Sequence, residues 1–167
     1  MPTGTRTRAH ILREKSHAFC HALVAPPPPK EMISTYFRKD NLKIIEYGPS
    51  WCRDRLPFLH TPYEGVSGDN SCQRYFEVLS KILKMHLPKD AFPGPDGFIV
   101  DVEAVTDRSG TEGVVCVTGK GRFESVKTGR SYGETFMYRL SGFDDEGRIG
   151  CWEIWSDSLS AWDAVGK

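Results

Sequence analysis

Two carboxylates and an indole share one face of the last strand that the sequence predicts. After a turn at Gly147, residues 149–157 read IGCWEIWSD, so Glu153, Trp155 and Asp157 are two residues apart from one another. Successive strand side chains point to opposite faces, which places these three together. A carboxyl group beside an indole is partly desolvated, and this raises its pKa toward the range useful for proton transfer. The face therefore predicts acid–base chemistry, with a surface Asp157 that caps the next turn as the alternative.

Glu153 has two possible roles on this strand. It lies on the same face as Asp157, four residues or about 13 Å back along the strand, and the two carboxylates can divide the acid and base roles. The other arrangement is an outward ion pair with a neighbour such as Arg139. We favour the pocket role and predict Glu153 as a second catalytic group.

A third acid, Glu134, begins the preceding strand. It shares a face with Phe136 and Tyr138, which is an unusual place for an unpaired acid. Either Glu134 faces the mouth of a pocket, or the strand end is frayed and the carboxylate is solvated. Tyr138 can donate a hydrogen bond to a substrate carbonyl, although a core tyrosine with a satisfied hydroxyl is the commoner arrangement.

Residues 48–70 form an irregular, aromatic-rich connection, and a loop this long in a small domain is usually functional or a lid. It contains His60, which can carry a proton near neutral pH and can pair with Asp157. A mobile, exposed loop histidine is the alternative. Tyr63 lies in the same segment, and we expect it to line the pocket entrance.

Two further side chains are candidates for substrate binding. Trp51 can stack on a ring, as can Trp155, and Arg38 can bind an oxyanion. Arg38 follows a predicted helix, so capping of the helix C-terminus is the alternative for it.

We predict neither a metal site nor a cofactor. His17, Cys20 and His21 share one helical face, but they flank the core stripe and no carboxylate completes a known ligand pattern, so we interpret them as structural. The sequence contains no phosphate-binding glycine loop, nucleophile elbow or Rossmann fingerprint.

The composition limits the partners. The 167 residues include 22 basic and 22 acidic side chains, so no net positive charge favours nucleic acid or an anionic membrane. No apolar run reaches membrane-spanning length, and the N-terminus lacks the apolar core of a signal peptide. Five scattered cysteines indicate reduced thiols in a cytoplasmic protein.

The elements that position these residues follow from hydrophobic periodicity. Helical periods predict helices over residues 8–23, 30–37 and 70–86, with a short strand over 42–47. The period then changes to two over residues 98–106, 113–124, 132–143 and 148–157, which predicts an antiparallel meander. Gly119 and Gly121 inside the second run suggest a bend or bulge. We expect one α+β domain over residues 1–167, with the helices on one sheet face and residues 1–7 flexible.

The order of these elements and two sequence passages resemble a known family. LPFLHTPYEG (56–65), followed by QRYFEVL, and ETFMYRLSGFDDEGRIGCWEIWSDSLSAW (134–162) are similar to the SnoaL-like proteins of the nuclear-transport-factor-two-like superfamily, in detail to the fungal secondary-metabolism branch. The resemblance implies a cone-shaped α+β barrel, in which three N-terminal helices pack on a curved, mainly antiparallel sheet around an apolar pocket. It also implies homodimers formed through the outer sheet face.

The resemblance further implies a cofactor-independent isomerase, cyclase or dehydratase that acts on an apolar, ring-bearing natural-product intermediate. Asp157 matches the family's acid at the end of the last strand. A lyase similar to scytalone dehydratase is a narrower version, but it needs more pocket histidines and tyrosines than this chain offers. The same fold also carries non-catalytic binding or dimerisation modules, which is the alternative function.

Overall fold

The computed structural model describes residues 4–106 and 112–167. Seven strands form one sheet in the order β2-β1-β7-β6-β5-β3, and β4 also pairs with β5. The strands are β1 (Lys43–Tyr47), β2 (Tyr63–Glu64), β3 (Leu83–His86), β4 (Ile99–Val105), β5 (Glu112–Ser125), β6 (Ser131–Ser141) and β7 (Cys151–Trp155). The helices are α1 (Arg8–Ala22), α2 (Pro29–Tyr36), α3 (Cys72–Ile82) and α4 (Ser158–Val165), with short 3₁₀ turns η1 (Ser50–Asp54) and η2 (Pro95–Gly97).

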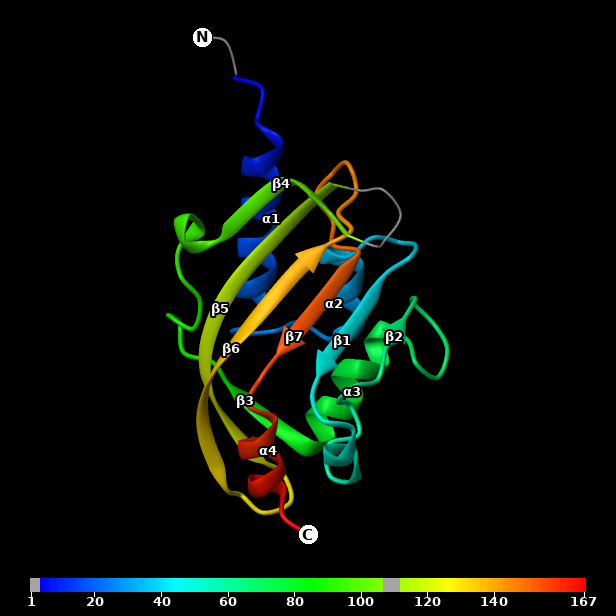
Figure 1. Cartoon of the computed structure of the whole chain (residues 1–167), viewed down its shortest axis with the longest axis vertical. Coiled ribbons are helices and arrows are strands. Elements are labelled where there is room, and N and C mark those ends of the chain that lie inside the picture. Colours follow the sequence, from blue (N-terminus) through cyan, green and yellow to red (C-terminus); the bar gives the residue numbers. More distant parts are fainter. Residues whose placement is uncertain (1–3, 107–111) are drawn as a thin grey trace.

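The sheet is mainly antiparallel, as predicted. Strands β4 to β7 pair in sequence order, each antiparallel to the next, and form the expected meander. β1 joins this meander in parallel with β7, with Glu46 opposite Ile154. Figure 1 shows the sheet curving around the helices, with α4 across the lower end. This arrangement confirms the predicted α+β fold class.

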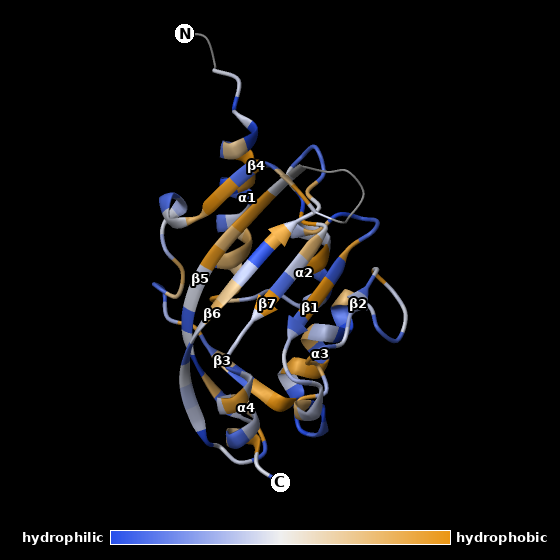
Figure 2. Ribbon diagram, in the orientation of Figure 1, coloured by the Kyte–Doolittle hydropathy of each residue, from blue (hydrophilic) through white to orange (hydrophobic). Residues whose placement is uncertain are grey.

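Aromatic packing joins the helices to the concave face of the sheet. The indole of Trp152 on β7 contacts the rings of Phe19 on α1, Tyr75 on α3 and Tyr138 on β6, with centroids 5.0, 5.7 and 5.1 Å away. Such edge-to-face contacts add to the free energy of burying the rings. Figure 2 shows hydrophobic residues gathered in the sheet and α3, while the connecting loops are mostly hydrophilic. The core therefore lies between the helices and the even-numbered residues of β7.

Local signals account for the helix starts. Thr7 caps α1 by accepting a hydrogen bond from the backbone N–H of His10, and Ser71 caps α3 in the same way from Arg74. Because Thr7 has this role, residues 4–7 lead directly into the helix, while residues 1–3 of the predicted flexible segment lie outside the described residues.

The predicted third helix is too long. It ends at Ile82, and residues 83–86 form β3, which pairs with β5 and directs Met85 toward Phe123. The sequence LKMH alternates apolar and polar residues, as a strand does. Its backbone groups form hydrogen bonds with β5, and this pairing stabilises the strand in preference to another helical turn. The prediction also omitted β2 and α4.

The glycines inside β5 mark a close ring contact. The β5–β6 pairing continues without a register shift through Gly119 and Gly121, so of the predicted bend or bulge, the bulge is absent. A Cβ atom on Gly119 would lie 2.5 Å from the ring of Phe136. The glycine therefore allows the ring of Phe136 to approach the backbone of β5 closely. Figure 1 shows that β5 is a strongly curved strand.

Candidate active site

A narrow interior cavity lies between the concave sheet face, α3 and α4. Its volume is about 30 Å³, which has room for one or two water molecules. Its wall is largely aromatic and aliphatic and includes two glutamates: Glu46, Leu56, Phe58, Leu59, Tyr75, Phe76, Leu79, Leu83, Met85, Phe123, Tyr132, Glu134, Phe136, Tyr138, Trp152, Ile154, Ser156, Ser158 and Ala161. Two carboxyl groups in so apolar an enclosure are the feature that requires a chemical explanation.

Glu46 is the more deeply placed of the two. It sits in the middle of β1 and is only 7% exposed. Its Oε2 accepts a 2.7 Å hydrogen bond from the hydroxyl of Tyr75, and its Oε1 accepts a 2.6 Å hydrogen bond from Ser156. Burial raises the pKa of Glu46, and these two hydrogen bonds oppose the rise. The carboxyl group is thereby fixed in orientation within the wall.

Glu134 lies at the partly open side of the cavity. Burial raises its pKa to about 7, with further contributions from the charges of Glu46 and Asp157, while a hydrogen bond from the backbone of Asp157 acts in the opposite direction. That bond joins Asp157 N to Oε2 of Glu134 over 2.9 Å. A carboxyl group with this pKa is present in both protonation states at neutral pH, which suits a general acid or base.

The end of β7 connects the two glutamates. Ser156 holds Glu46, and the next residue, Asp157, donates its backbone N–H to Glu134. Placing Glu134 at the mouth of a pocket, one of the two arrangements that the sequence leaves open, agrees with this geometry. The sequence analysis did not consider Glu46, Tyr75 or Ser156. The one signal for Glu46 was an acid in the otherwise apolar strand KIIEY.

The face of β7 that the sequence predicts for chemistry points away from the cavity. Register pairs Glu153 with Arg139 and Trp155 with Met137 on the convex side, whereas Trp152 and Ile154 line the cavity. Both faces of this strand are apolar enough to be buried, so alternation alone could not identify the inner one. The prediction of a pocket-facing Glu153 was therefore wrong.

Glu153 instead forms the alternative ion pair with Arg139. Arg139 donates to both carboxylate oxygens, over 2.6 and 2.8 Å, and the hydroxyl of Tyr47 donates a third hydrogen bond over 2.9 Å. Trp155 stacks on Tyr47 at 4.9 Å. These residues form a hydrogen-bonded cluster on the convex face, and none of the four lines the cavity.

Asp157 is the N-cap of α4, as in the alternative reading of the sequence. Its carboxylate accepts hydrogen bonds from the backbone N–H and the hydroxyl of Ser160, and the side chain is exposed. His60 is also exposed, in a left-handed turn with φ of 54°, and its backbone N–H donates to the carbonyl of Glu46. The structure therefore does not bring His60 and Asp157 together as a side-chain pair.

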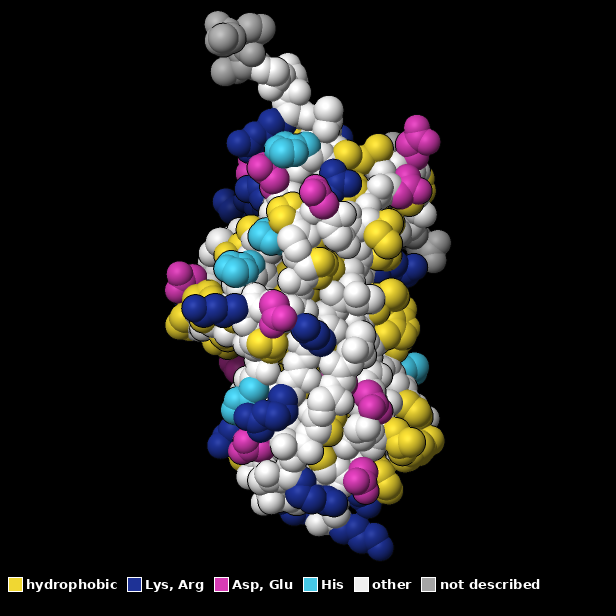
Figure 3. All heavy atoms as spheres, turned by 90° about the vertical axis from the view of Figure 1, so that its left-hand side faces the viewer, with side chains coloured by type: hydrophobic (Ala, Val, Ile, Leu, Met, Phe, Trp, Pro, Cys, Tyr) yellow, Lys and Arg dark blue, Asp and Glu magenta, His cyan; other side chains and the backbone are white. Residues whose placement is uncertain are grey.

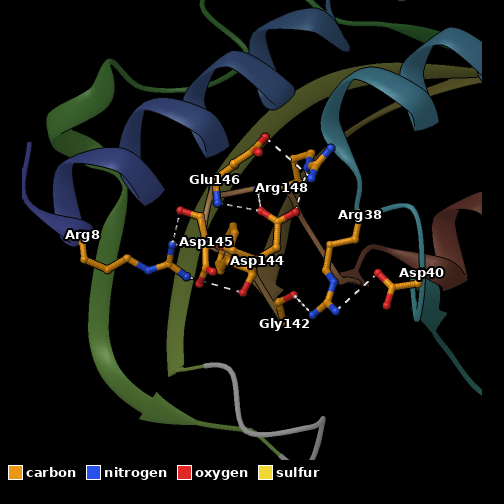
Figure 4. Close-up of polar contacts among 9 residues, drawn as sticks. Arg8, Arg38, Asp40, Gly142, Asp144, Asp145, Glu146 and Arg148 are labelled. Carbon is orange, nitrogen blue, oxygen red and sulfur yellow. Dashed lines mark hydrogen bonds and ion pairs between the residues drawn. The ribbon is translucent and has the colours of Figure 1, made fainter.

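The other predicted binding residues are dispersed. Tyr138 lines the cavity, whereas Tyr63 is buried against the ring of Tyr75 and lies outside the cavity wall. Trp51 is 58% exposed and packs edge-on against Trp162. Figure 4 shows Arg38 directed toward the carbonyl of Gly142 and toward Asp40, so it neither reaches the cavity nor caps α2.

The described residues contain no group of three or more potential metal ligands. His17 and His21 stack on each other at 5.9 Å on α1, next to buried Cys20, which agrees with the structural interpretation. No helix among the described residues is long and apolar enough to cross a membrane.

A larger surface groove adjoins the interior cavity. It runs along β3, β5 and β6, has a volume of about 900 Å³, and shares Met85 and Glu134 with the cavity wall. His86, Lys120 and Arg122 contribute to its rim. Figure 3 shows a face on which basic and acidic side chains are interspersed, in keeping with the zero net charge. Met85 and Glu134 thus separate the small cavity from a hollow large enough for a ligand.

Comparison with solved structures places this geometry in a known fold. An NTF2-like protein of unknown function from Burkholderia pseudomallei has a TM-score of 0.68 at 15% identity, over 94% of this chain and 98% of that one. TerC, co-crystallised with polyporic acid, has a TM-score of 0.63 at 15% identity, over 94% and 99%. A phenazine biosynthesis-related protein from Pseudomonas aeruginosa has a TM-score of 0.54 at 13% identity, over 99% and 88%.

These similarities show the NTF2-like fold, and at such low identity they show the fold alone. No family model and no curated protein matches the chain. The fungal secondary-metabolism branch therefore stays a prediction.

Proposed function

We propose that the protein is a cofactor-independent acid–base enzyme that moves a proton on an apolar, ring-bearing substrate, with isomerisation as the simplest reaction. The observation that carries this proposal is the convergence of Glu46 and Glu134 on one apolar cavity. Proton transfer between two carbon positions requires a base, an acid and an apolar enclosure, and it requires no redox or group-transfer reagent.

Glu134 is the group we assign as the base. Its pKa of about 7 leaves a substantial ionised fraction at neutral pH, and its ionised form is destabilised by burial. A carboxylate in this environment takes a proton from an acidic C–H more readily than one in water. The protonated Glu134 can then return the proton to a different atom of the same substrate.

Tyr138 is the group we assign to the substrate oxygen. Its ring is buried in the cavity wall, next to the two glutamates that line the same cavity. Donation from this O–H would stabilise the negative charge that develops on a carbonyl when an adjacent proton leaves. Glu46, held by Tyr75 and Ser156, keeps the proton affinity of Glu134 high through its charge.

The small volume of the cavity requires movement before a ring can enter. Met85 is the side chain best suited to this, because it belongs to both the cavity and the adjoining groove and because methionine adapts its shape at low cost. TerC, with a similar fold, was co-crystallised with polyporic acid. This precedent supports a role in binding an aromatic ligand for the present protein.

A generic proton-abstraction substrate, 5-nitrobenzisoxazole, tests the assignment without knowledge of the natural substrate. We expect turnover that rises with pH through about 7, is lost in Glu134→Gln and is retained in Asp157→Asn. Met85→Ala should increase the rate by enlarging the entrance. No rate above that of Glu134→Gln in either the wild type or Met85→Ala would contradict the proposal.

The alternative is a non-catalytic binding or dimerisation module, and the cavity volume of about 30 Å³ favours it. In that case aromatic ligands would bind in the groove with an affinity that does not change between pH 5 and pH 9, and Glu134→Gln would leave that affinity unchanged.

We further propose a homodimer that associates through the convex face of β6 and β7, in the cytoplasm, with no nucleic-acid or membrane partner. Met137 is 37% exposed there, beside Trp155 and the Arg139–Glu153 pair. None of the five cysteines, all of which lie within the described residues, forms a disulfide, which fits a reducing compartment. Sedimentation of the wild type and of Met137→Glu tests the interface: a dimer that the variant dissociates supports it, and a monomeric wild type contradicts it.

A further inference from the structure

A separate hollow lies between α2, the loop after β2 and the start of α3. Its volume is about 370 Å³, and it shares no lining residue with the interior cavity. Ile33 and Phe37 form its apolar floor, Val66 projects from the loop after β2, and Lys30, Arg38 and Lys39 contribute three positive charges. A concave site that combines an apolar floor with positively charged side chains at its edge has the general character of a ligand site.

The charges that line this hollow are unbalanced. None of the described residues that line it is acidic, and the described parts of the chain place no ion-pair partner within reach of Lys30 or Lys39. The nearest acids along the chain are Glu31, which faces outward on α2, and Asp40, which is 80% exposed. On a chain with zero net charge, this concentration of positive charge is a local feature that attracts anions.

Arg38 is the least exposed of the three cations. Its side chain is only 16% exposed, yet its contact with Asp40 is long, at 3.5 Å. Its other terminal nitrogen donates to the carbonyl of Gly142, and the buried Nε has no acceptor among the described residues (Figure 4). An anion in the adjacent hollow would bring further negative charge close to this largely buried guanidinium.

We infer that this hollow is a second binding site, separate from the proposed acid–base cavity, for a small molecule that joins an anionic group to an apolar body. Lys30, Arg38 and Lys39 bind the carboxylate or phosphate. Ile33, Phe37 and Val66 contact the apolar part, and the 54% exposed side chain of Val66 loses solvent contact when the ligand binds.

The Nε–H signal of Arg38 in ¹H–¹⁵N NMR spectra reports on this site directly. Benzoate and phenyl phosphate are the probes, because they present the two candidate anions on the same ring, and benzyl alcohol is the neutral control. We expect a saturable shift of the Arg38 signal with at least one of the anions and none with benzyl alcohol. The tighter of the two probes identifies the preferred anion.

Variants separate specific binding from general charge effects. Lys30→Gln/Lys39→Gln should weaken binding by about tenfold, because two of the three positive charges that attract the anion are lost. The matched control Lys81→Gln/Lys89→Gln removes the same charge from outside the hollow and should leave the affinity unchanged. The inference is wrong if neither anion produces a saturable shift, or if both double variants bind alike. Either result leaves the acid–base proposal intact, because the two sites share no residue.

Discussion

The backbone N–H of Asp157 donates a 2.9 Å hydrogen bond to Oε2 of Glu134. This bond links the N-cap residue of α4 to the carboxyl group of Glu134, whose pKa is about 7. The neighbouring Ser156 holds Glu46, so the turn between β7 and α4 orients both acids of the cavity. Any movement of α4 therefore changes the environment of the proposed base.

Glu134 should make the stability of the protein depend on pH. Its pKa is near 4.5 when unfolded and about 7 when folded, so the native state binds the additional proton between these values. The contribution is complete below pH 4.5 and is lost as pH rises through 7. In Glu134→Gln this part of the pH dependence should disappear. Urea unfolding at pH 5 and pH 8 should show that the variant gains about 1–2 kcal/mol relative to wild type at pH 8, after allowance for partial solvent exposure.

Removal of Glu46 should destabilise the core. In Glu46→Ala the buried hydroxyl of Tyr75 loses its acceptor, and an unsatisfied buried polar group costs about 1–3 kcal/mol. The double variant Glu46→Ala/Tyr75→Phe removes both partners and should recover part of that loss. Thermal or urea unfolding of the three proteins measures the difference, and an equally unstable double variant would argue against the hydrogen bond as the cause.

Asp157 should matter for stability and little for proton transfer. Asp157→Ala removes the cap of α4 and should cost about 1 kcal/mol, whereas Asp157→Asn keeps an acceptor for Ser160 and should be near neutral. Both variants retain the backbone N–H that contacts Glu134. Loss of activity in Asp157→Asn, with a folded protein, would return the catalytic role to Asp157.

The Arg139–Glu153 pair should stabilise the sheet without influencing the cavity. Glu153 has a side chain only 9% exposed and accepts both hydrogen bonds of the Arg139 guanidinium, so Arg139→Ala should destabilise by about 1–3 kcal/mol. A double-mutant cycle with Glu153→Gln measures the coupling. Activity toward 5-nitrobenzisoxazole should not change in either single variant.

The sequence predicts the architecture well where periodicity is unambiguous. The period-two runs correspond to β4, β5, β6 and β7, and the first two helical stripes correspond to α1 and α2. The prediction assigned residues 83–86 to a helix. Four residues are too few to distinguish the helical period from the strand period, and it is their pairing with β5 that makes them a strand.

The candidate site was less predictable for a related reason. Both faces of β7 carry a tryptophan and are largely buried. Only the register with β6 determines that Trp152 faces the cavity and Glu153 does not. Glu46 lies within a short strand whose local sequence is typical of a core strand. Only its hydrogen bonds with Tyr75 on α3 and Ser156 after β7 identify it as part of the candidate site. Contacts between segments distant in sequence leave no local pattern.

The most direct test is a ¹³C NMR titration of the Glu134 side-chain carboxyl group in the wild type and in Glu46→Gln. We predict a midpoint near pH 7 in the wild type, because burial and the charge of Glu46 both oppose ionisation, and a lower midpoint in the variant, in which the Glu46 charge is absent. A wild-type midpoint in the ordinary range of about 4 to 5 would contradict the claim that this cavity holds a proton ready for transfer at neutral pH.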